Sequence, residues 1–437
     1  MEKICNWGLY PCIKTNLIER KDYDDLYEII VNSNNLIARG NGRCYGDSSL
    51  NKDHIISTLR FNKVISFDSE NGIIKAESGI LIKDLLELIV PEGFFLAVTP
   101  GTKYVTLGGA VASNVHGKNH HKEGAFSSYI ENIELINAKG ELIECSRNRN
   151  TQLFSNTIGG MGLTGIIVSV TLKLRKIETA YLKQKSIKIK GVDELLDKLE
   201  EYNFYTYSVA WLNCNSMKNS TRKSILLLGE HALLKDLPVD KKNNPLKVQR
   251  SNPLINVPFT FPSFILNKQF ISNWNSIYYN KQIKKESNFL IHYNSFFYPL
   301  DSISNWNRVY GKKGFTQFQF VIPFTKGKEG IKNIIDKIVS SSCFSPLAIL
   351  KIMGDKCEYA APISFPMPGY TLALDFKLNR QNIDLINQLH TLVLKYEGKI
   401  YLTKDLLIPK NLFKEMYNTD FTHPNKFQSL QSTRLDI

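Results

Sequence analysis

The part of this sequence best suited to chemistry is a glycine-rich stretch that ends in basic and polar side chains. Val98–His121 reads VTPGTKYVTLGGAVASNVHGKNHH and carries four glycines among small residues. Glycine lets a backbone pass close to a ligand, and bare N–H groups in such a loop suit a phosphate or a flavin edge. The stretch therefore predicts a ligand cradle beside titratable groups, as in an enzyme site. The polar residues at its end are His116, Lys118, Asn119, His120 and His121.

A second loop of the same kind lies upstream. Ala38–Ser48 reads ARGNGRCYGDS, and its glycines together with Arg39 and Arg43 would suit a pyrophosphate. It is not the dinucleotide fingerprint of a Rossmann unit, because the third glycine, Gly46, is one position late and no long helical pattern follows. A glycine-rich hairpin loop with exposed arginines is the alternative interpretation.

Both loops belong to a first region, residues 1–177, in which short strand-like runs alternate with turns. The runs Ile73–Glu77, Asn132–Asn137 and Gly165–Leu174 contain the β-branched residues typical of strands. A helix is expected over Leu81–Val90, since a proline follows it. The length of 437 residues predicts two or three domains in all.

The second region, residues 178–397, is denser in aromatic residues and has a helical stretch near 328–341. The last forty residues, 398–437, begin with the strand-like Lys399–Leu402. The whole pattern predicts an α+β fold with a first domain that binds a cofactor and a middle domain that binds a substrate. The strand-like runs of the second region are Tyr207–Leu212, Phe318–Pro323 and Tyr370–Phe376.

Composition and cysteine usage narrow the class of protein. The hydrophobic content of 43% and charged content of 22% fit a soluble globular protein. No run approaches the roughly 18 apolar residues of a membrane span, and no signal-peptide core is present at the N-terminus. We therefore expect a cytoplasmic protein, at most peripheral at the inner face of a membrane. Seven scattered cysteines without a CxxC motif predict reduced thiols rather than a metal site or a disulfide.

The net charge of +14 is concentrated in one part of the chain. Residues 217–285 hold twelve Lys or Arg against three acidic residues, which gives +9, and they include the apolar, proline-broken stretch 253–266. We predict a flexible basic insertion over about 217–285. It could form a lid, lie on an anionic membrane where each basic residue contributes about 1 kcal/mol, or be a solvated loop. Nucleic-acid binding is not expected, because no recognition motif accompanies the charge.

The two glycine-rich loops resemble the flavin-binding segments of the vanillyl-alcohol oxidase superfamily, whose FAD-binding domain is of the PCMH type. Within the superfamily, the segments are most similar to oxidases of lipid-linked pentofuranoses. The resemblance covers nearly the whole chain and is weakest over 217–285. It continues in order through IGGMGLTGIIVSVTL (158–172), YSVAWL (207–212), FYPLDSISNWNRVYGKKGFTQFQFVIP (297–323), SFPMPGY (364–370) and YLTKD (401–405).

The resemblance implies a fold and a mode of cofactor binding. A two-subdomain FAD-binding domain (1–177) would be interrupted by an α+β substrate-binding domain with an antiparallel sheet (178–397). Residues 398–437 would return to the FAD domain. In many members a histidine of the first loop bonds covalently to the flavin, whereas the matching residue here is Arg43, so we predict noncovalent FAD. Cys44, where the nearest relatives have serine, is expected to be a packed thiol.

Residues of both loops and of two later segments are implied to contact FAD. They are Arg39, Gly40, Asn41, Gly42, Arg43, Cys44, Tyr45, Gly46, Asp47, Ser48, Gly101, Thr106, Leu107, Gly108, Gly109, Ser113, Asn114, Val115, His116, Ile167 and Tyr401.

The implied reaction oxidises a secondary alcohol, the 2′-OH of a polyprenyl-phosphoryl pentofuranose, to the ketone. A hydride leaves for the flavin, and the hydroxyl proton needs a base or a hydrogen-bonded relay. The resemblance assigns catalysis to Lys404, His116 and Tyr45. Lys404 could stabilise the alkoxide or the reduced flavin, or act as base if burial lowers its pKa. The alternatives are a surface lysine beside Asp405, a histidine that only braces its loop and a tyrosine that only packs on FAD.

A further set of side chains is implied to line the substrate pocket. Gln317 and Gln319 would share one face of a strand. Relatives carry an Asn and, two residues later, a Cys where this chain has Thr371 and Ala373, so the identity of the substrate stays open. Thiol-reactive inhibitors aimed at this position should find no target. The implied pocket residues are Lys118, Trp211, Phe297, Gln317, Gln319, Lys351, Thr371 and Ala373.

The resemblance also implies partners and a place in cell wall or glycan biosynthesis. A separate short-chain NAD(P)H reductase would complete an epimerisation, a quinone or O₂ would accept the electrons, and a peripheral membrane contact would suit the lipid-linked substrate. One alternative is an FAD-dependent oxidase or dehydrogenase of a soluble sugar, alditol or nucleotide sugar. Another is a flavin-free binding protein, against which the three catalytic residues argue. His120 and His121 are expected to fix their loop.

Overall fold

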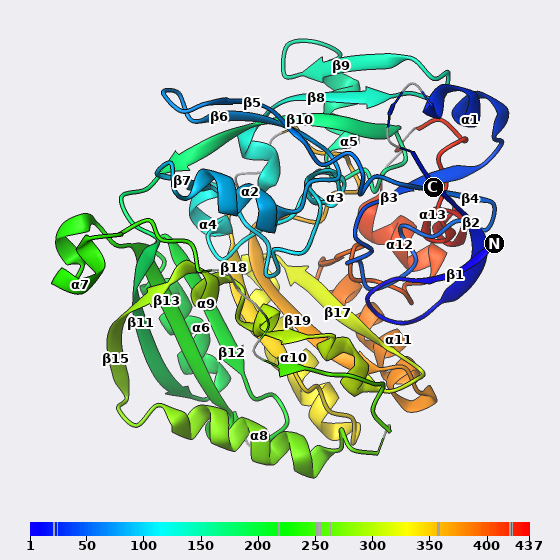
Figure 1. Cartoon of the computed structure of the whole chain (residues 1–437). Coiled ribbons are helices and arrows are strands. Elements are labelled where there is room, and N and C mark those ends of the chain that lie inside the picture. Colours follow the sequence, from blue (N-terminus) through cyan, green and yellow to red (C-terminus); the bar gives the residue numbers. More distant parts are fainter. Residues whose placement is uncertain are drawn as a thin grey trace.

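The strands of the computed structural model form three main sheets with helices packed against them (Figure 1). The protein is therefore a mixed α+β fold with antiparallel sheets, as the sequence predicts. No helix in the described part of the chain is long and apolar enough to cross a bilayer. The structure describes all residues except Lys21, Asp24, 217–218, 250–252, Leu254, Ser263, 356–358, 419–420 and Thr422.

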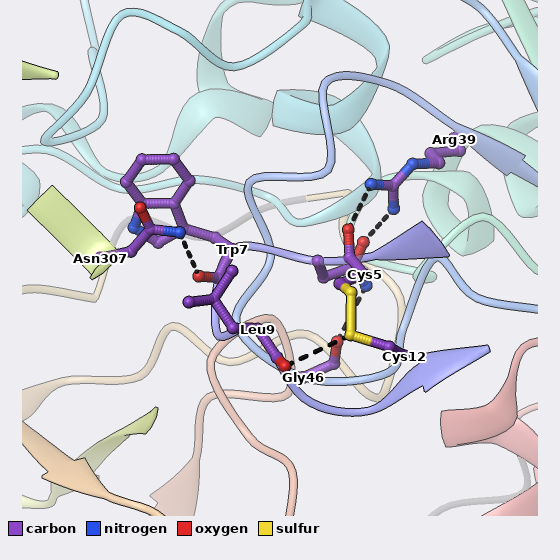
Figure 2. The surroundings of a disulfide bond; sticks show 8 residues. Cys5, Trp7, Leu9, Cys12, Arg39, Gly46 and Asn307 are labelled. Carbon is purple, nitrogen blue, oxygen red and sulfur yellow. Dashed lines mark hydrogen bonds between the residues drawn. A yellow bond between two sulfur atoms is a disulfide. The ribbon is translucent and has the colours of Figure 1, made fainter. Parts of the chain in front are cut away.

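The N-terminal sheet has the strand order β1-β2-β4-β3, and β2, β3 and β4 run parallel. An antiparallel β1–β2 hairpin places Cys5 opposite Cys12, with 4.4 Å between their Cα atoms, and the two form a disulfide (Figure 2). The prediction of reduced thiols is wrong for this pair, because the hairpin brings them together. The elements are β1 (Glu2–Cys5), β2 (Cys12–Glu19), α1 (Leu26–Asn32), β3 (Leu36–Arg39) and β4 (His54–Ser57).

The middle sheet is antiparallel, with the order β5-β6-β10-β8-β9 and β7 paired to β10. The expected strand Ile73–Glu77 is β6, and the expected helix over 81–90 is α2. Apolar residues of α2, α3, β6, β8 and β10 form one buried core. The elements are β5 (Val64–Asp68), β6 (Ile73–Glu77), α2 (Ile82–Ile89), β7 (Phe94–Leu96), α3 (Leu107–Ala112), α4 (His120–Glu123), β8 (Ile130–Ile136), β9 (Leu142–Ser146), α5 (Thr151–Thr157) and β10 (Ile166–Lys176).

The large sheet has the order β15-β11-β13-β12-β18-β19-β17-β20. Helices α6, α10 and α11 cover one of its faces (Figure 1), and in its central strands β17, β18 and β19 even-numbered residues such as Phe318, Leu350 and Leu372 are buried in that core. Because side chains alternate along a strand, the odd-numbered residues point to the opposite face. The elements are β11 (Tyr181–Lys190), α6 (Val192–Glu201), β12 (Tyr207–Leu212), β13 (Lys223–His231), β15 (Glu286–His292), α9 (Tyr293–Phe297), β17 (Phe315–Ile322), α10 (Phe324–Ser340), β18 (Ala348–Met353), β19 (Gly369–Lys377), α11 (Arg380–Lys395) and β20 (Lys399–Ile400).

The basic region 217–285 is more regular than the predicted insertion. Its first part contains β13, which lies between β11 and β12 in the large sheet, so this part is not an insertion. The prediction rested on the charge of the region and did not take account of the apolar, largely buried strand sequence SILLLG within it. The later elements are α7 (Val239–Lys242), β14 (Ile255–Asn256), which pairs with β16 (Ile303–Ser304), and α8 (Lys268–Lys281).

The C-terminal segment joins the large sheet to the N-terminal sheet. Strand β20 pairs with β17, and helices α12 (Lys410–Tyr417) and α13 (Leu430–Leu435) follow. Leu36 of β3 donates its N–H to the carbonyl of Lys426 at 3.0 Å, and Arg434 pairs with Asp47 at 3.1 Å. The end of the chain therefore holds the first glycine-rich loop in place.

Candidate active site

A cavity of about 320 Å³ lies between the two glycine-rich loops, the open face of the large sheet and the C-terminal segment. Segments far apart in the sequence thus contribute to one site. The predicted residues that line it are Gly40, Asn41, Gly42, Arg43, Cys44, Tyr45, Ser48, Gly101, Thr106, Gly108, Gly109, Ser113, Val115, His116, Ile167, Gln317, Gln319, Lys351, Ala373, Tyr401 and Lys404.

Other predicted residues lie outside the cavity, and each has a different contact. The Arg39 guanidinium donates to the Cys5 carbonyl at 2.8 Å and to Asn6, so it holds the disulfide hairpin (Figure 2). Asp47 is paired with Arg434. These two side chains fix the shape of the loop. The residues outside the cavity are Arg39, Gly46, Asp47, Leu107, Asn114, Lys118, Trp211, Phe297 and Thr371.

Lys118 is turned toward α9. Its Nζ donates to the carbonyl of Phe296 and lies 4.5 Å from the centroid of that ring. Burial, with the charge of Lys351 adding to it, lowers the pKa of Lys118 to about 7. Thr371 does not line the cavity but contacts a residue that does: its Oγ1 accepts a hydrogen bond from Gln319 Nε2 at 3.3 Å. Trp211 packs edge-to-face on Tyr278.

One half of the cavity, which we call the flavin half, is made of the two glycine-rich loops. Within the part of the chain that the structure describes, the backbone N–H groups of residues 41–44 have no hydrogen-bond acceptor. Gly42 adopts a left-handed φ of +59°, and a Cβ built on Gly101 would meet no atom within 4 Å. Unused N–H groups beside such open backbone suit the pyrophosphate and ring of FAD. The residues present therefore fit this cofactor.

A hydrogen bond between the two loops and bonds from two other segments hold the flavin half together. Asn41 Nδ2 donates to the carbonyl of Tyr104 at 2.7 Å, which ties one loop to the other. Tyr401 Oη donates to the carbonyl of Ser113 at 3.0 Å. On the N-terminal side, Trp7 donates its N–H to the Cys44 carbonyl at 3.0 Å, and the Arg43 guanidinium carbon lies 4.0 Å from the Trp7 ring centroid.

The other half, which we call the sugar half, is made by the open face of the large sheet and Lys404. Gln317 and Gln319 of β17, Lys351 of β18 and Ala373 of β19 all line it, as alternation along the strands requires. Lys404 Nζ lies 4.1 Å from the ring centroid of Tyr45. The sugar half is therefore polar and cationic.

A carboxylate that the sequence analysis missed lies close enough to Lys404 to affect its charge. Asp375 is buried and accepts hydrogen bonds from Tyr310 Oη and Gln317 Nε2, each at 2.7 Å. Burial raises the pKa of Asp375 to about 6. Burial lowers the pKa of Lys404 to about 8, although the charge of Asp375 opposes that change. Asp375 follows Thr371 and Ala373 at intervals of two, so the strand pattern could have revealed it.

Asp405 does not pair with Lys404. Its carboxylate bonds instead to Arg434 at 3.0 Å and to the backbone N–H groups of Leu407 and Ile408, both at 2.9 Å. This geometry leaves Lys404 available to the cavity.

His116 lies between two polar neighbours. Its Nδ1 is 3.0 Å from Lys351 Nζ, and its Nε2 is 3.1 Å from Gln319 Nε2. Burial and the charge of Lys351 hold the pKa of His116 well below its usual value, so the ring is neutral. Burial, with the charge of Lys404 adding to it, lowers the pKa of Lys351 to about 7. Both ring nitrogens therefore face donor groups, and because a neutral imidazole accepts on one nitrogen only, either Lys351 or the Gln319 amide donates to it in a given tautomer.

The two following histidines contact backbone and do not line the cavity. His120 Nδ1 accepts from the N–H of Gly354 at 3.1 Å, and His121 Nε2 lies 2.8 Å from the carbonyl of Tyr205. Both therefore hold the loop, as expected.

Asp301 is a second carboxylate that sequence reasoning missed. It lines the cavity, and it accepts from Thr102 Oγ1 at 2.7 Å and from the N–H of Lys103 at 2.9 Å. Its bonds join the glycine-rich loop to the segment after α9. No spacing in the sequence indicated this contact, or the contribution of Trp7 and Trp306 to the cavity wall.

Comparisons with known proteins agree with this geometry. Residues 20–146 match the FAD binding domain family. The chain is 31% identical over 426 residues to decaprenylphosphoryl-β-D-ribose oxidase of Mycolicibacterium smegmatis, an alignment that covers 95% of this chain and 91% of that protein. It is 26% identical over 349 residues to an uncharacterized protein in the mprA 5′ region of Streptomyces coelicolor, covering 77% and 92%. It is 25% identical over 211 residues to L-gulonolactone oxidase of Bos taurus, covering 46% and 48%.

Fold, cavity and relatives define an FAD-dependent oxidoreductase that acts on CH–OH groups. More narrowly, the chain belongs to the decaprenylphosphoryl-β-D-ribose oxidase family within the vanillyl-alcohol oxidase superfamily.

Proposed function

We propose that this protein oxidises the 2′-hydroxyl of a polyprenyl-phosphoryl pentofuranose to the ketone, with noncovalently bound FAD as the hydride acceptor. One observation carries the proposal. Lys404 of the sugar half, with its lowered pKa, lies over the ring of Tyr45 from the first glycine-rich loop. The relative that matches 95% of the chain is an oxidase of a sugar of this kind.

FAD would be held by the flavin half. The unused N–H groups of residues 41–44 would bind the pyrophosphate, and Gly101, Gly108 and Gly109 would lie against the ring system. Arg43 is stacked on Trp7, and the Cys44 thiol lies 3.2 Å from Ser49 Oγ. Neither geometry suggests a covalent link. When bound, FAD supplies the two-electron acceptor that no side chain can provide.

Lys404 would handle the hydroxyl proton. With a pKa of about 8, it is a mixture of amine and ammonium near neutral pH. The amine can remove the proton of the 2′-hydroxyl, and the ammonium can stabilise the oxyanion as the proton leaves. The negative charge of Asp375 favours the ammonium form of Lys404. It therefore raises the pH at which Lys404 loses its proton.

The remaining groups of the sugar half would orient the substrate. Gln317 and Gln319 line the cavity, and amide side chains suit sugar hydroxyl groups. His116, which lies between Lys351 and Gln319 in the same cavity, would help to orient the sugar hydroxyl. Two lysines in a confined cavity also suit an anionic phosphate.

A second candidate is the oxidation of a soluble sugar, alditol or nucleotide sugar. It is favoured by the similarity of nearly half of the chain to L-gulonolactone oxidase and by Thr371 and Ala373, which alter the sugar half. In the first candidate the keto sugar would pass to a separate short-chain NAD(P)H reductase, which would complete an epimerisation. A quinone or O₂ would reoxidise the flavin.

Anaerobic bleaching of the flavin band distinguishes the two candidates. We expect bleaching with polyprenyl-phosphoryl pentoses and none with free pentoses, alditols or nucleotide sugars. Bleaching by a soluble sugar alone would establish the second candidate. A purified protein that shows no flavin bands even after FAD is added would contradict both.

A further inference from the structure

Helix α8 has apolar side chains on its outer face as well as on its inner face. Phe270, Trp274 and Ile277 follow one another at helical spacing and are exposed, with 55% of Trp274 and 66% of Ile277 accessible. Phe264 just before the helix is 75% exposed, and Ile283 just after it is 93% exposed. A contiguous apolar patch of this kind marks an interaction surface. We call these five side chains and the lysines described next the α8 surface.

The charge of this surface has one sign. Lys268, Lys281, Lys284 and Lys285 are all exposed around the apolar row, and none forms an ion pair in the described part of the chain. No Asp or Glu occurs in the sequence between Asp240 and Glu286. A partner complementary to the α8 surface would therefore present negative charge across all of it.

The inner face of α8 is anchored in the protein. Ile271 is buried in a cluster with Tyr45 and Tyr310, and Tyr279 is buried beside Trp211. Tyr45 lines the cavity, as does Ile349, which packs in the same cluster as Tyr279. The outer apolar row is thus not needed for the core, and α8 lies against the wall of the active site. Figure 1 shows α8 below the lower ends of strands β11, β13 and β12 of the large sheet.

We propose that the α8 surface docks on an anionic lipid bilayer. A helix with an apolar row, an aromatic residue at its centre and lysines at its borders lies in the plane of a membrane interface. Its lysines meet anionic headgroups while Phe264, Trp274 and Ile277 enter the boundary of the acyl chains. The purpose of the surface rests on the proposed function, since docking there would bring the cavity wall next to a membrane-held polyprenyl carrier.

Vesicle flotation of the full-length protein with FAD tests the proposal. We expect binding to vesicles of phosphatidylcholine with phosphatidylglycerol, weaker binding at high salt, and little binding to phosphatidylcholine alone. Trp274→Ser with Ile277→Ser should weaken binding about tenfold or more. The single substitutions Lys281→Gln, Lys284→Gln and Lys285→Gln should each weaken vesicle binding about fivefold, which is equivalent to about 1 kcal/mol. A matched control, Ile65→Ser with Leu142→Ser, removes equally exposed side chains from the middle sheet and should bind normally.

The outcomes separate this proposal from the proposed function. Normal flavin content and normal bleaching by a water-soluble short-chain phosphoryl pentose in the α8 variants, together with lost vesicle binding, would support docking. Absence of binding by the unsubstituted protein, or equal binding to neutral vesicles, would overturn docking while bleaching still reports on function. A concentration-dependent dimer in light scattering that the same substitutions break would overturn it in favour of a second copy of this chain.

Discussion

The flavin half and the sugar half of the cavity present different chemical groups. The flavin half presents backbone: glycines, unused N–H groups and small side chains, held from behind by Arg39, Asn41 and Tyr401. The sugar half presents ionisable side chains, Lys351 on the sheet face and Lys404 on the segment after β20, and burial has shifted the pKa values of both. The first half therefore works through shape and the second through charge. Substitutions in the two halves should fail in different ways.

The largest effect should come from Lys404→Met. The variant should retain its flavin, because Lys404 lies on the sugar half, but the rate of anaerobic flavin bleaching should fall by about 10³-fold, within the range for loss of a general acid or base. Flavin content by absorbance and bleaching by stopped flow measure the two quantities separately. Loss of flavin together with activity would show that the halves are not independent.

Lys351→Met should change how stability depends on pH. The pKa of Lys351 is about 7 in the folded protein and ordinary, near 10.5, in the unfolded chain. Between these values the unfolded chain binds more protons, so stability rises with pH by up to about 1.4 kcal/mol per unit from this group. Flavin-free protein should therefore gain stability from pH 7 to pH 9, and the variant should gain less. Parallel denaturation midpoints for the two proteins across this range would contradict the shifted lysine.

Gly101→Leu probes the flavin half by shape alone. Nothing in the protein lies within 4 Å of a Cβ at this position, so the fold should tolerate the side chain while it fills space needed by FAD. We expect roughly 10- to 100-fold weaker FAD binding, the scale of overpacking a filled site, with an unchanged melting temperature for the flavin-free protein. Gly101→Ala is the graded control and should bind FAD nearly normally. Equal affinity in the leucine variant would place the cofactor elsewhere.

Asp375→Asn should give the smallest effect, a displaced pH profile. The carboxylate raises the pKa of Lys404, so its removal should move the limb of kcat/KM governed by Lys404 to lower pH by about one unit. Tyr310→Phe removes a hydrogen bond to Asp375 but leaves its charge, and the limb should stay in place. A limb that moves to higher pH, or moves equally in both variants, would remove Asp375 from this role.

The sequence predicted this site where function depends on local pattern. Glycine spacing identified both loops, and strand alternation placed Gln317 and Gln319 on one face, where both line the cavity. The sequence did not predict the contacts between segments that lie far apart in the chain. The resemblance implies a ligand contact for Arg39, and nothing local in the sequence shows that β1 and β2 form a hairpin beside it. Lys118 follows the cradle in sequence but turns toward α9.

The fold shows the same division. Strands with clear alternation were predicted to within a few residues, as β6, β12 and β19 show. Strand β13 was missed because the basic residues around it dominated the composition of the region, whereas its position depends on pairing with β11 and β12. Asp301 was missed because its partners are 198 and 199 residues away.

Single-turnover flavin bleaching with deuterium-labelled substrate would show which C–H bond this enzyme breaks. We expect polyprenyl-phosphoryl pentose carrying deuterium at C2′ to bleach the flavin more slowly than the unlabelled compound, because the C2′–H bond breaks as hydride leaves. Deuterium at C3′ should leave the rate unchanged. A slower rate with C3′ deuterium and an unchanged rate with C2′ deuterium would contradict oxidation of the 2′-hydroxyl at this site.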